Sequence, residues 1–99
     1  MSVGIVATLK IQDGKQAAFE EAFAACQTAV KATEPGCHLY SLCRDKSDNT
    51  TYVVMEIYAD EEARKTHGSS DEVRAAMGAL GGMLAGAPTL SEVEIVSSI

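Results

Sequence analysis

The chain opens with an alternation of apolar and polar residues from Val3 to Ile11. Because successive side chains of a strand point to opposite sides, this period of two residues predicts a first β-strand. A second strand is predicted over residues 37–45, and a third, rich in Tyr, Val and Ile, over residues 51–59. The polar turn between them, residues 46–50, makes the pair an antiparallel hairpin. A last strand is predicted over residues 89–96.

Between the first two strands the apolar residues follow the helical period instead. Asp13 and Gln16 have the spacing of a capping box, which predicts that a helix begins there. The helix is expected to end near Pro35, because proline bars the residue before it from the helical region. Its apolar stripe consists of Phe19, Ala22, Phe23, Cys26 and Val30.

A second helical region follows the third strand. Asp60 is placed to cap a short helix that extends to about His67. Ser69 and Glu72 form another capping box, and the helix after it carries the stripe Val73, Met77, Leu80 and Leu84. The order β-α-β-β-α-β predicts one α+β domain over residues 1–99 with a ferredoxin-like fold. In that fold a four-stranded antiparallel sheet carries its helices on one face.

Helices on one face leave the other face of the sheet uncovered. The third strand is nevertheless apolar on both sides, since Val53, Met55 and Ile57 point one way and Val54 and Tyr58 the other. A sheet that is apolar on both faces needs cover on both, and the simplest cover is a second copy related by a two-fold axis. We therefore expect a homodimer whose interface is formed by Val3, Ile5, Leu9, Val53, Met55 and Ile57.

The composition narrows the range of partners. The chain is 46% hydrophobic and 22% charged, with a net charge of −6 and no cluster of Lys and Arg. Neither nucleic acid nor an anionic membrane is therefore an expected partner. No apolar run approaches the roughly 20 residues that span a bilayer. The first five residues have neither the charged region nor the cleavage site of a signal peptide.

The three cysteines, Cys26, Cys37 and Cys43, are an odd number. On one extended strand Cys37 and Cys43 would lie about 20 Å apart, whereas a disulfide needs Cα atoms within about 7 Å of each other. Unpaired thiols fit a reducing compartment, so we expect a cytoplasmic protein.

Side chains that can carry chemistry gather where the third strand meets the short helix. Glu56, Tyr58 and His67 supply a carboxylate, a phenol and an imidazole. An imidazole titrates at about pH 6.5 and can act as a general base, although a surface histidine at a helix end is the simpler alternative. Glu56 shares its side of the strand with two tyrosines, which favours a ligand pocket. An ion pair with Arg44, or with a residue of another strand, would explain Glu56 equally well.

Several short motifs, taken together, are similar to a known family. They are the run Glu34-Pro35-Gly36-Cys37, Tyr40 in the second strand, the spacing Glu56-x-Tyr58-x-Asp60-x-x-Ala63-x-x-x-His67, and Ser70. With these motifs the chain resembles the antibiotic biosynthesis monooxygenase superfamily over nearly its whole length. The resemblance implies a dimeric α+β barrel with a pocket between sheet and helices in each subunit. Some members oxidise electron-rich phenols or quinols with O₂ and no cofactor, others are isomerases, and many have no known substrate.

The haem-degrading branch of this superfamily has its own residue pattern. It has an asparagine in the first strand, a tryptophan near the last helical region and a haem-ligating histidine further on. The matching positions here are near Ala7, His67 and Met77, so the resemblance does not extend to haem degradation. Val73 stands where the family usually has an aromatic residue.

The leading hypothesis is a cofactor-independent monooxygenase that oxidises a small hydroxylated aromatic or quinol, with no cofactor and no metal. His67 and Glu56 are the candidate catalytic residues. His67 would take a phenolic proton, and Glu56 would hold His67 or a substrate hydroxyl. The substrate-binding candidates, whose tyrosines would orient the ring, are Tyr58, Tyr40, Met77 and Val73.

Two other functions fit the same residues. An isomerase or lyase would use the same acid–base pair without oxygen, and product formed under anaerobic conditions would identify it. A dimeric small-molecule binder would need no catalysis at all. A pocket filled by Tyr40, Tyr58 and Met77, with no cavity beside His67, would favour the binder.

Overall fold

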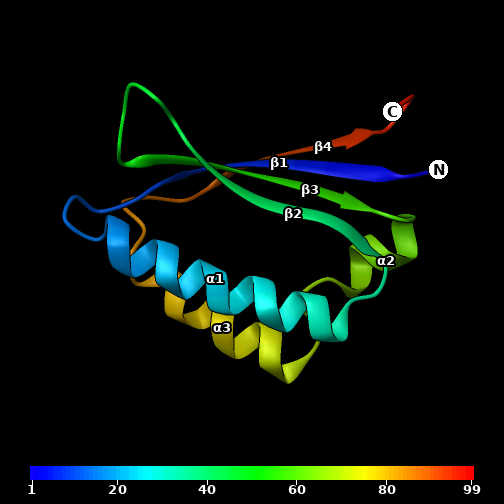
Figure 1. The fold of residues 1–99 in the computed structure, drawn as a ribbon, viewed down its shortest axis with the longest axis horizontal. Helices are drawn as coiled ribbons and strands as arrows, with labels where there is room; N and C mark the ends of the chain where they lie inside the picture. The colour runs from blue at the N-terminus through cyan, green and yellow to red at the C-terminus, as the bar shows by residue number, and fades with distance from the viewer.

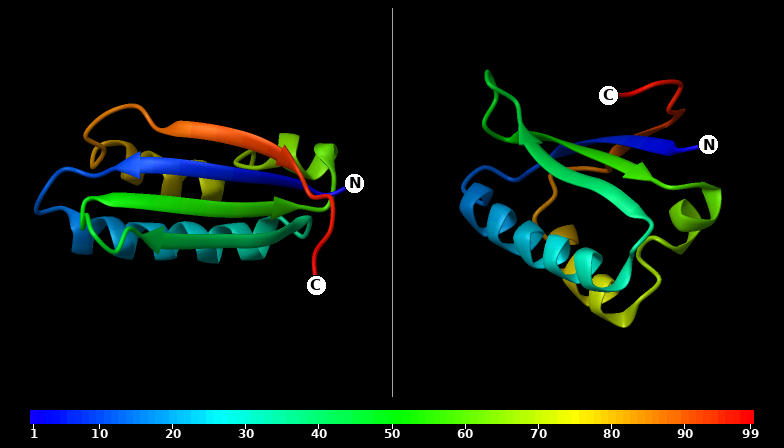
Figure 2. Two further views of the ribbon diagram at one scale, coloured as in Figure 1. Left: turned by 90° about the horizontal axis from the view of Figure 1, so that it is seen from above. Right: turned by 45° about the vertical axis from the view of Figure 1, so that its right-hand side comes forward.

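A computed structural model describes residues 1–99 and has the predicted ferredoxin-like fold (Figure 1). In chain order its elements are β1 (Val3–Lys10), α1 (Gln16–Thr33), β2 (Cys37–Arg44), β3 (Thr51–Tyr58), α2 (Glu61–Thr66), α3 (Asp71–Gly81) and β4 (Thr89–Glu94). The four strands form one antiparallel sheet in the order β2-β3-β1-β4. All the helices lie beneath one face of this sheet, and the other face is open (Figure 2). No helix is both long enough and apolar enough to cross a membrane.

Two of the three predicted helix starts differ from the structure. Asp13 does not cap α1: its carboxylate accepts from the Gln16 amide at 3.1 Å, and Lys15 is the residue that precedes the helix. Between them Gly14 takes a positive φ of 88°, so the chain is still turning where the capping box was expected. At α3 the cap is Ser70 rather than Ser69, and its hydroxyl accepts from the Val73 N–H at 3.2 Å. Asp60 caps α2 as predicted, accepting from the Ala63 N–H at 2.9 Å.

The core lies between the sheet and α1. Phe19, Phe23, Cys26 and Val30 of the predicted stripe are buried, whereas Ala22 is partly exposed. They pack on the side of β3 that carries Tyr52, Val54, Glu56 and Tyr58, all of which are buried. The alternation in β3 therefore predicted correctly which residues share a face.

The predicted interface combined residues from opposite faces, and this expectation was wrong for β1. In the antiparallel register Val3 is opposite Tyr58 and Ile5 is opposite Glu56, so these residues share the helix-covered face. Val3 and Ile5 are each only 4% exposed. Leu9, opposite Tyr52, also lies on that face.

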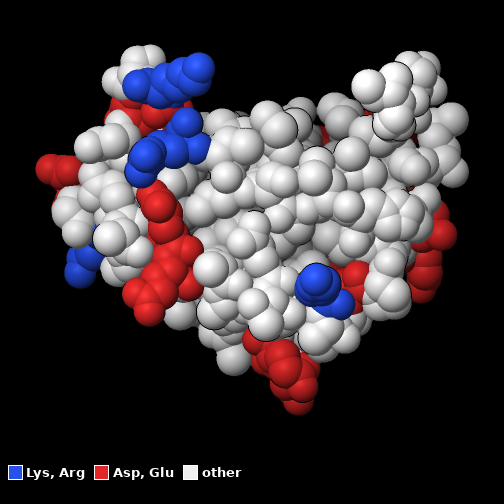
Figure 3. Space-filling view, viewed as in Figure 1, with Lys and Arg blue, Asp and Glu red and all other residues white.

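The open face carries the other set of alternating residues. Val6 of β1 lies opposite Met55 of β3, and Gly4 lies opposite Ile57. The large apolar side chains that this face exposes are Val6 at 39%, Leu39 at 38%, Met55 at 45% and Val93 at 43%. Seen from the side, Lys and Arg are interspersed with Asp and Glu and form no single broad patch (Figure 3).

A close contact between Gly36 and Ala63 holds α2 against the start of β2. A Cβ atom on Gly36 would lie 2.6 Å from Ala63 Cβ, well inside contact distance. The Gly36 carbonyl also accepts from the Ala59 N–H at 2.8 Å, which ties the start of β2 to the end of β3. Because His67 follows α2 directly, this contact also positions the histidine.

We expect Gly36→Ala to lower the free energy of unfolding by about 1–3 kcal/mol, as overpacking usually does. Urea denaturation measures the change. Ala63→Gly removes the opposing methyl group, and on its own it should cost about 1 kcal/mol of helix stability. The double variant should then be more stable than the sum of the two single losses predicts. Strict additivity would show that the two residues do not clash.

Candidate active site

A cavity of about 350 Å³ lies between the sheet and the helices. Its walls come from all four strands and all three helices, with contributions from the loops that follow α2 and α3. The lining is mostly apolar: Ile5, Ala7, Leu9, Phe19, Phe23, Val54, Met77, Leu80, Leu84, Pro88 and Leu90. Tyr40, Glu56, Arg64 and His67 are the side chains in the wall that carry polar atoms. Such a cavity, apolar with a few convergent polar groups, is the usual form of a small-molecule site.

His67 is held in the wall of this cavity by Glu34, the residue that ends α1. Glu34 Oε1 lies 2.7 Å from His67 Nδ1, and Glu34 Oε2 accepts from the Gly68 N–H at 2.9 Å. The His67 side chain is 11% exposed. An ionised carboxylate only accepts, so this contact places the imidazole proton on Nδ1. Nε2 is then the basic nitrogen, oriented by a carboxylate as in other histidine bases.

Glu56 lies on the other side of the imidazole. Its Oε1 is 3.8 Å from His67 Nε2 and accepts a hydrogen bond of 2.5 Å from the Tyr58 hydroxyl. Burial, and secondly the bond to Glu56, raise the pKa of Tyr58 well above its ordinary value. Tyr58 therefore stays a neutral donor that fixes Glu56. Arg44 is not its partner, because Arg44 donates to Glu20 at 3.0 Å.

Tyr40 presents its ring to the cavity and to His67. The two ring centroids are 5.4 Å apart in an edge-on arrangement, and Tyr40 also stacks on Phe23, with ring centroids 5.0 Å apart. Its hydroxyl lies 3.6 Å from Cys26 Sγ. Burial is the main cause of a raised pKa for Tyr40, so this ring also stays neutral. Tyr40 is thus placed to pack against a ligand ring rather than to exchange protons.

Comparison with known proteins identifies the group to which this fold and site belong. The family model described as antibiotic biosynthesis monooxygenase matches residues 2–79. The chain belongs to this family. A search of curated protein sequences gave no match.

Several solved structures superpose closely on the chain. A protein from Caulobacter crescentus CB15 named for the family is 44% identical, with a TM-score of 0.91, over 97% of this chain and 91% of that one. One from Nitrosomonas europaea is 16% identical, with a TM-score of 0.89, over 96% and 90%. SnoaB from Streptomyces nogalater, named a cofactor-independent oxygenase, is 20% identical, with a TM-score of 0.83, over 99% and 96%. At identities of 16% and 20%, the last two comparisons show only that the fold is shared.

The structure of this family member brings some of the predicted site residues together and separates others. His67, Glu56, Tyr40 and Met77 line the cavity. Tyr58 and Val73 are fully buried and do not line it. Tyr58 lies behind the site, with its ring centroid 5.2 Å from that of His67, and Val73 packs with Cys26 and Val30.

Two further polar residues of the site were not among the sequence candidates. Glu34 ends α1, where the helix dipole disfavours an acid, so its position there was a signal that something else holds it. Arg64 is three residues before His67 on α2, a spacing that puts both side chains on one helical face. Neither feature is specific enough in a sequence to identify a site.

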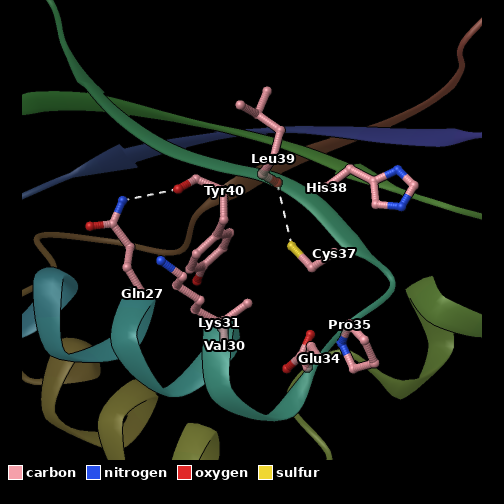
Figure 4. Close-up of a pocket in the computed structure, with 9 residues that line it drawn as sticks. All are labelled: Gln27, Val30, Lys31, Glu34, Pro35, Cys37, His38, Leu39 and Tyr40. Atoms are coloured by element: carbon pink, nitrogen blue, oxygen red, sulfur yellow. Dashed lines mark hydrogen bonds between the residues drawn. The ribbon is translucent and has the colours of Figure 1, made fainter.

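A second hollow, of about 390 Å³, lies on the outer side of α1 and β2 (Figure 4). It shares Glu34 and Tyr40 with the site and also contains Cys37. The Cys37 thiol donates to the Leu39 carbonyl at 3.4 Å. The His38 ring points away from the Cys37 sulfur (Figure 4). Burial, followed by the negative charge of Glu34, raises the pKa of Cys37 to about 11. The thiol is therefore protonated at neutral pH and is a poor nucleophile.

No group of three or more His, Cys, Asp and Glu side chains converges in a way that could hold a metal ion. All three cysteines are free.

Proposed function

We propose that this protein is a cofactor-independent monooxygenase that oxidises a small hydroxylated aromatic or quinol with O₂. The observation that carries the proposal is His67, whose Nδ1 is held by Glu34 while the imidazole lines an apolar cavity. An oriented histidine in an apolar site is suited to take a proton from a phenol. Membership of the family, and its likeness in fold to a protein named a cofactor-independent oxygenase, support the same reaction class.

The chemistry begins with a proton transfer from the substrate hydroxyl to His67 Nε2. The resulting anion is electron-rich enough to reduce O₂, so the substrate supplies the electrons. In a quinol, one ring carbon–hydrogen bond and both hydroxyl oxygen–hydrogen bonds break, and one carbon–oxygen bond forms. One oxygen atom of O₂ becomes the new hydroxyl group and the other leaves as water. The product is a hydroxyquinone, and the four electrons lost by the quinol are the four that O₂ takes up.

The apolar walls assist this sequence by excluding water from the anion. Tyr40, edge-on to His67, is placed to pack against the substrate ring. Glu56, held by Tyr58, lies close enough to His67 to stabilise the imidazolium once the proton has moved. The cavity beside His67 also favours an enzyme over a binder whose pocket is filled by its own side chains.

A homodimer is part of the proposal. The open face of the sheet exposes apolar side chains from all four strands, among them Val6, Leu39, Met55 and Val93. A shallow apolar groove runs over this face between Val6, Met55 and Ile95. A contiguous apolar surface of this kind is the usual mark of a protein interface, and a second copy is the partner that a two-fold axis supplies.

We further propose that the protein works in the cytoplasm. Three free cysteines, one of them fully buried, support a reducing compartment.

Oxygen uptake tests the proposed reaction. Purified protein, treated with a chelator, is incubated with a panel of quinols and hydroxylated bicyclic aromatics while dissolved O₂ is followed with an electrode. At least one compound should give uptake well above its spontaneous oxidation rate. If every member of the panel oxidises at the spontaneous rate, the proposal is wrong for this class of substrate.

A further inference from the structure

Arg64 supplies the single permanently charged cation of the cavity wall. It is the one Lys or Arg among the residues that line the cavity. On α2 it lies three residues before His67, so the two side chains project from the same side of the helix. The helix therefore presents a base and a fixed cation to the same space.

The Arg64 side chain is 29% exposed, and one nitrogen of its guanidinium has no hydrogen-bond partner. Its Nε is buried and has no partner in the structure. The nearest carboxylate oxygen, Glu92 Oε1 on β4, is 3.7 Å from Nε, beyond hydrogen-bond distance, and the Glu92 side chain is itself half exposed. A buried donor without an acceptor is unfavourable, so a bound group that accepts from Nε would be stabilised at this position.

Because two carboxylates lie in or near the cavity wall, the binding of an acidic ligand depends on Arg64. Glu56 lines the cavity and Glu34 lies directly behind His67, so both carboxylates repel an anion. Arg64 is the group that can offset this repulsion. Its planar fork of donors matches a carboxylate, and it keeps its charge across the whole physiological range.

We infer that Arg64 is an anion-binding residue, and that the substrate is a small aromatic bearing an ionised carboxylate as well as the hydroxyl that His67 deprotonates. The identity of the substrate rests on the proposed function, whereas the anion-binding role of Arg64 does not. The carboxylate contacts the guanidinium, and the ring extends past Tyr40 among the apolar side chains. The cavity volume of about 350 Å³ sets the size of a compact ligand, near the lower end of the range for small-molecule sites.

Calorimetric binding of a matched ligand pair tests this assignment without any turnover. The ligands are 2-naphthoate and 2-naphthamide, which share a ring and a shape but differ in charge, and neither has a hydroxyl to oxidise. Wild-type protein should bind the carboxylate at least tenfold more tightly than the amide. Arg64→Gln should abolish this preference, and Arg64→Lys should keep part of it. Arg74→Gln is the matched control, since Arg74 is exposed on α3 and donates to the Ser69 carbonyl.

Several binding outcomes would overturn the inference. They are equal affinities for the two ligands, no binding of either ligand, and a preference that persists in Arg64→Gln. A slower turnover of neutral quinols in Arg64→Gln, with naphthoate binding unchanged, would assign the arginine to the anion formed in the reaction and would also overturn it. Arg64-dependent naphthoate binding in a protein that takes up no oxygen would refute the proposed reaction and leave the anion site standing.

Discussion

Replacing His67 with glutamine is expected to lower kcat/KM for oxygen uptake by about 10²- to 10⁴-fold, which is the usual contribution of a positioned general base. Glutamine keeps the polarity of the side chain and can still hydrogen-bond to Glu34, but it cannot accept the phenolic proton. The residual rate should rise with pH as the substrate ionises in solution. Initial rates from an oxygen electrode, measured across a range of pH, test both expectations.

The other histidine of the chain provides the control. His38 is exposed and belongs to the outer hollow (Figure 4), and it does not line the cavity that contains His67. His38→Gln should therefore react at the wild-type rate. Glu34→Gln should give an intermediate loss, because the amide can still hold the imidazole but supplies no negative charge to the imidazolium. A His67→Gln variant as fast as wild type would remove the histidine from the mechanism.

Replacing Met55 with aspartate is expected to split the proposed dimer into folded monomers. Met55 is 45% exposed on the open face of the sheet, next to Val6, so the single chain tolerates a charge there. In a dimer the same carboxylate would be buried against an apolar surface without a partner, at a cost that a small interface cannot offset. Sedimentation should give twice the chain mass of 10.4 kDa for wild type and the chain mass itself for the variant.

A charge added elsewhere controls for this experiment. Ala75 is exposed on α3, on the far side of the helices from the open face, and Ala75→Asp should remain a dimer. Circular dichroism establishes that each variant is folded. Wild-type protein that sediments as a stable monomer at micromolar concentration would refute the proposed dimer. The open face of the sheet would then not be covered by a second copy.

The order of helices and strands could be predicted from the sequence because each element depends on the pattern of neighbouring residues. Alternation gave β1 and β3, and the stripe from Phe19 to Val30 gave α1. The same alternation divides a strand into two sets of side chains but does not say which set meets the helices. For β1 that choice depends on its register with β3, in which Val3 faces Tyr58. Register is a property of the assembled sheet, and this is why the predicted interface mixed two faces.

For the candidate site, too, the sequence predicts features that depend on neighbouring residues but not contacts between residues far apart in the chain. His67 and Glu56 could be proposed from residue type and from their positions on a helix end and an apolar strand. The contact of His67 with Glu34 joins the ends of two helices 33 residues apart, and no periodicity predicts it. The sequence also does not show which side chains of one strand face reach the cavity. Tyr58 and Glu56 share a face of β3, yet only Glu56 lines the cavity.

The fate of ¹⁸O₂ tests the proposed oxygenation most directly. Chelator-treated protein is given a substrate from the oxygen-uptake panel under ¹⁸O₂, and the product is analysed by mass spectrometry alongside an anaerobic sample. The proposed reaction predicts one labelled oxygen atom in the product, the other in water, and no product without oxygen. Labelled product should form at least 10²-fold more slowly with His67→Gln and at the wild-type rate with His38→Gln. Product formed without oxygen, or carrying oxygen from water alone, would contradict a monooxygenase and assign the site to isomerase or lyase chemistry.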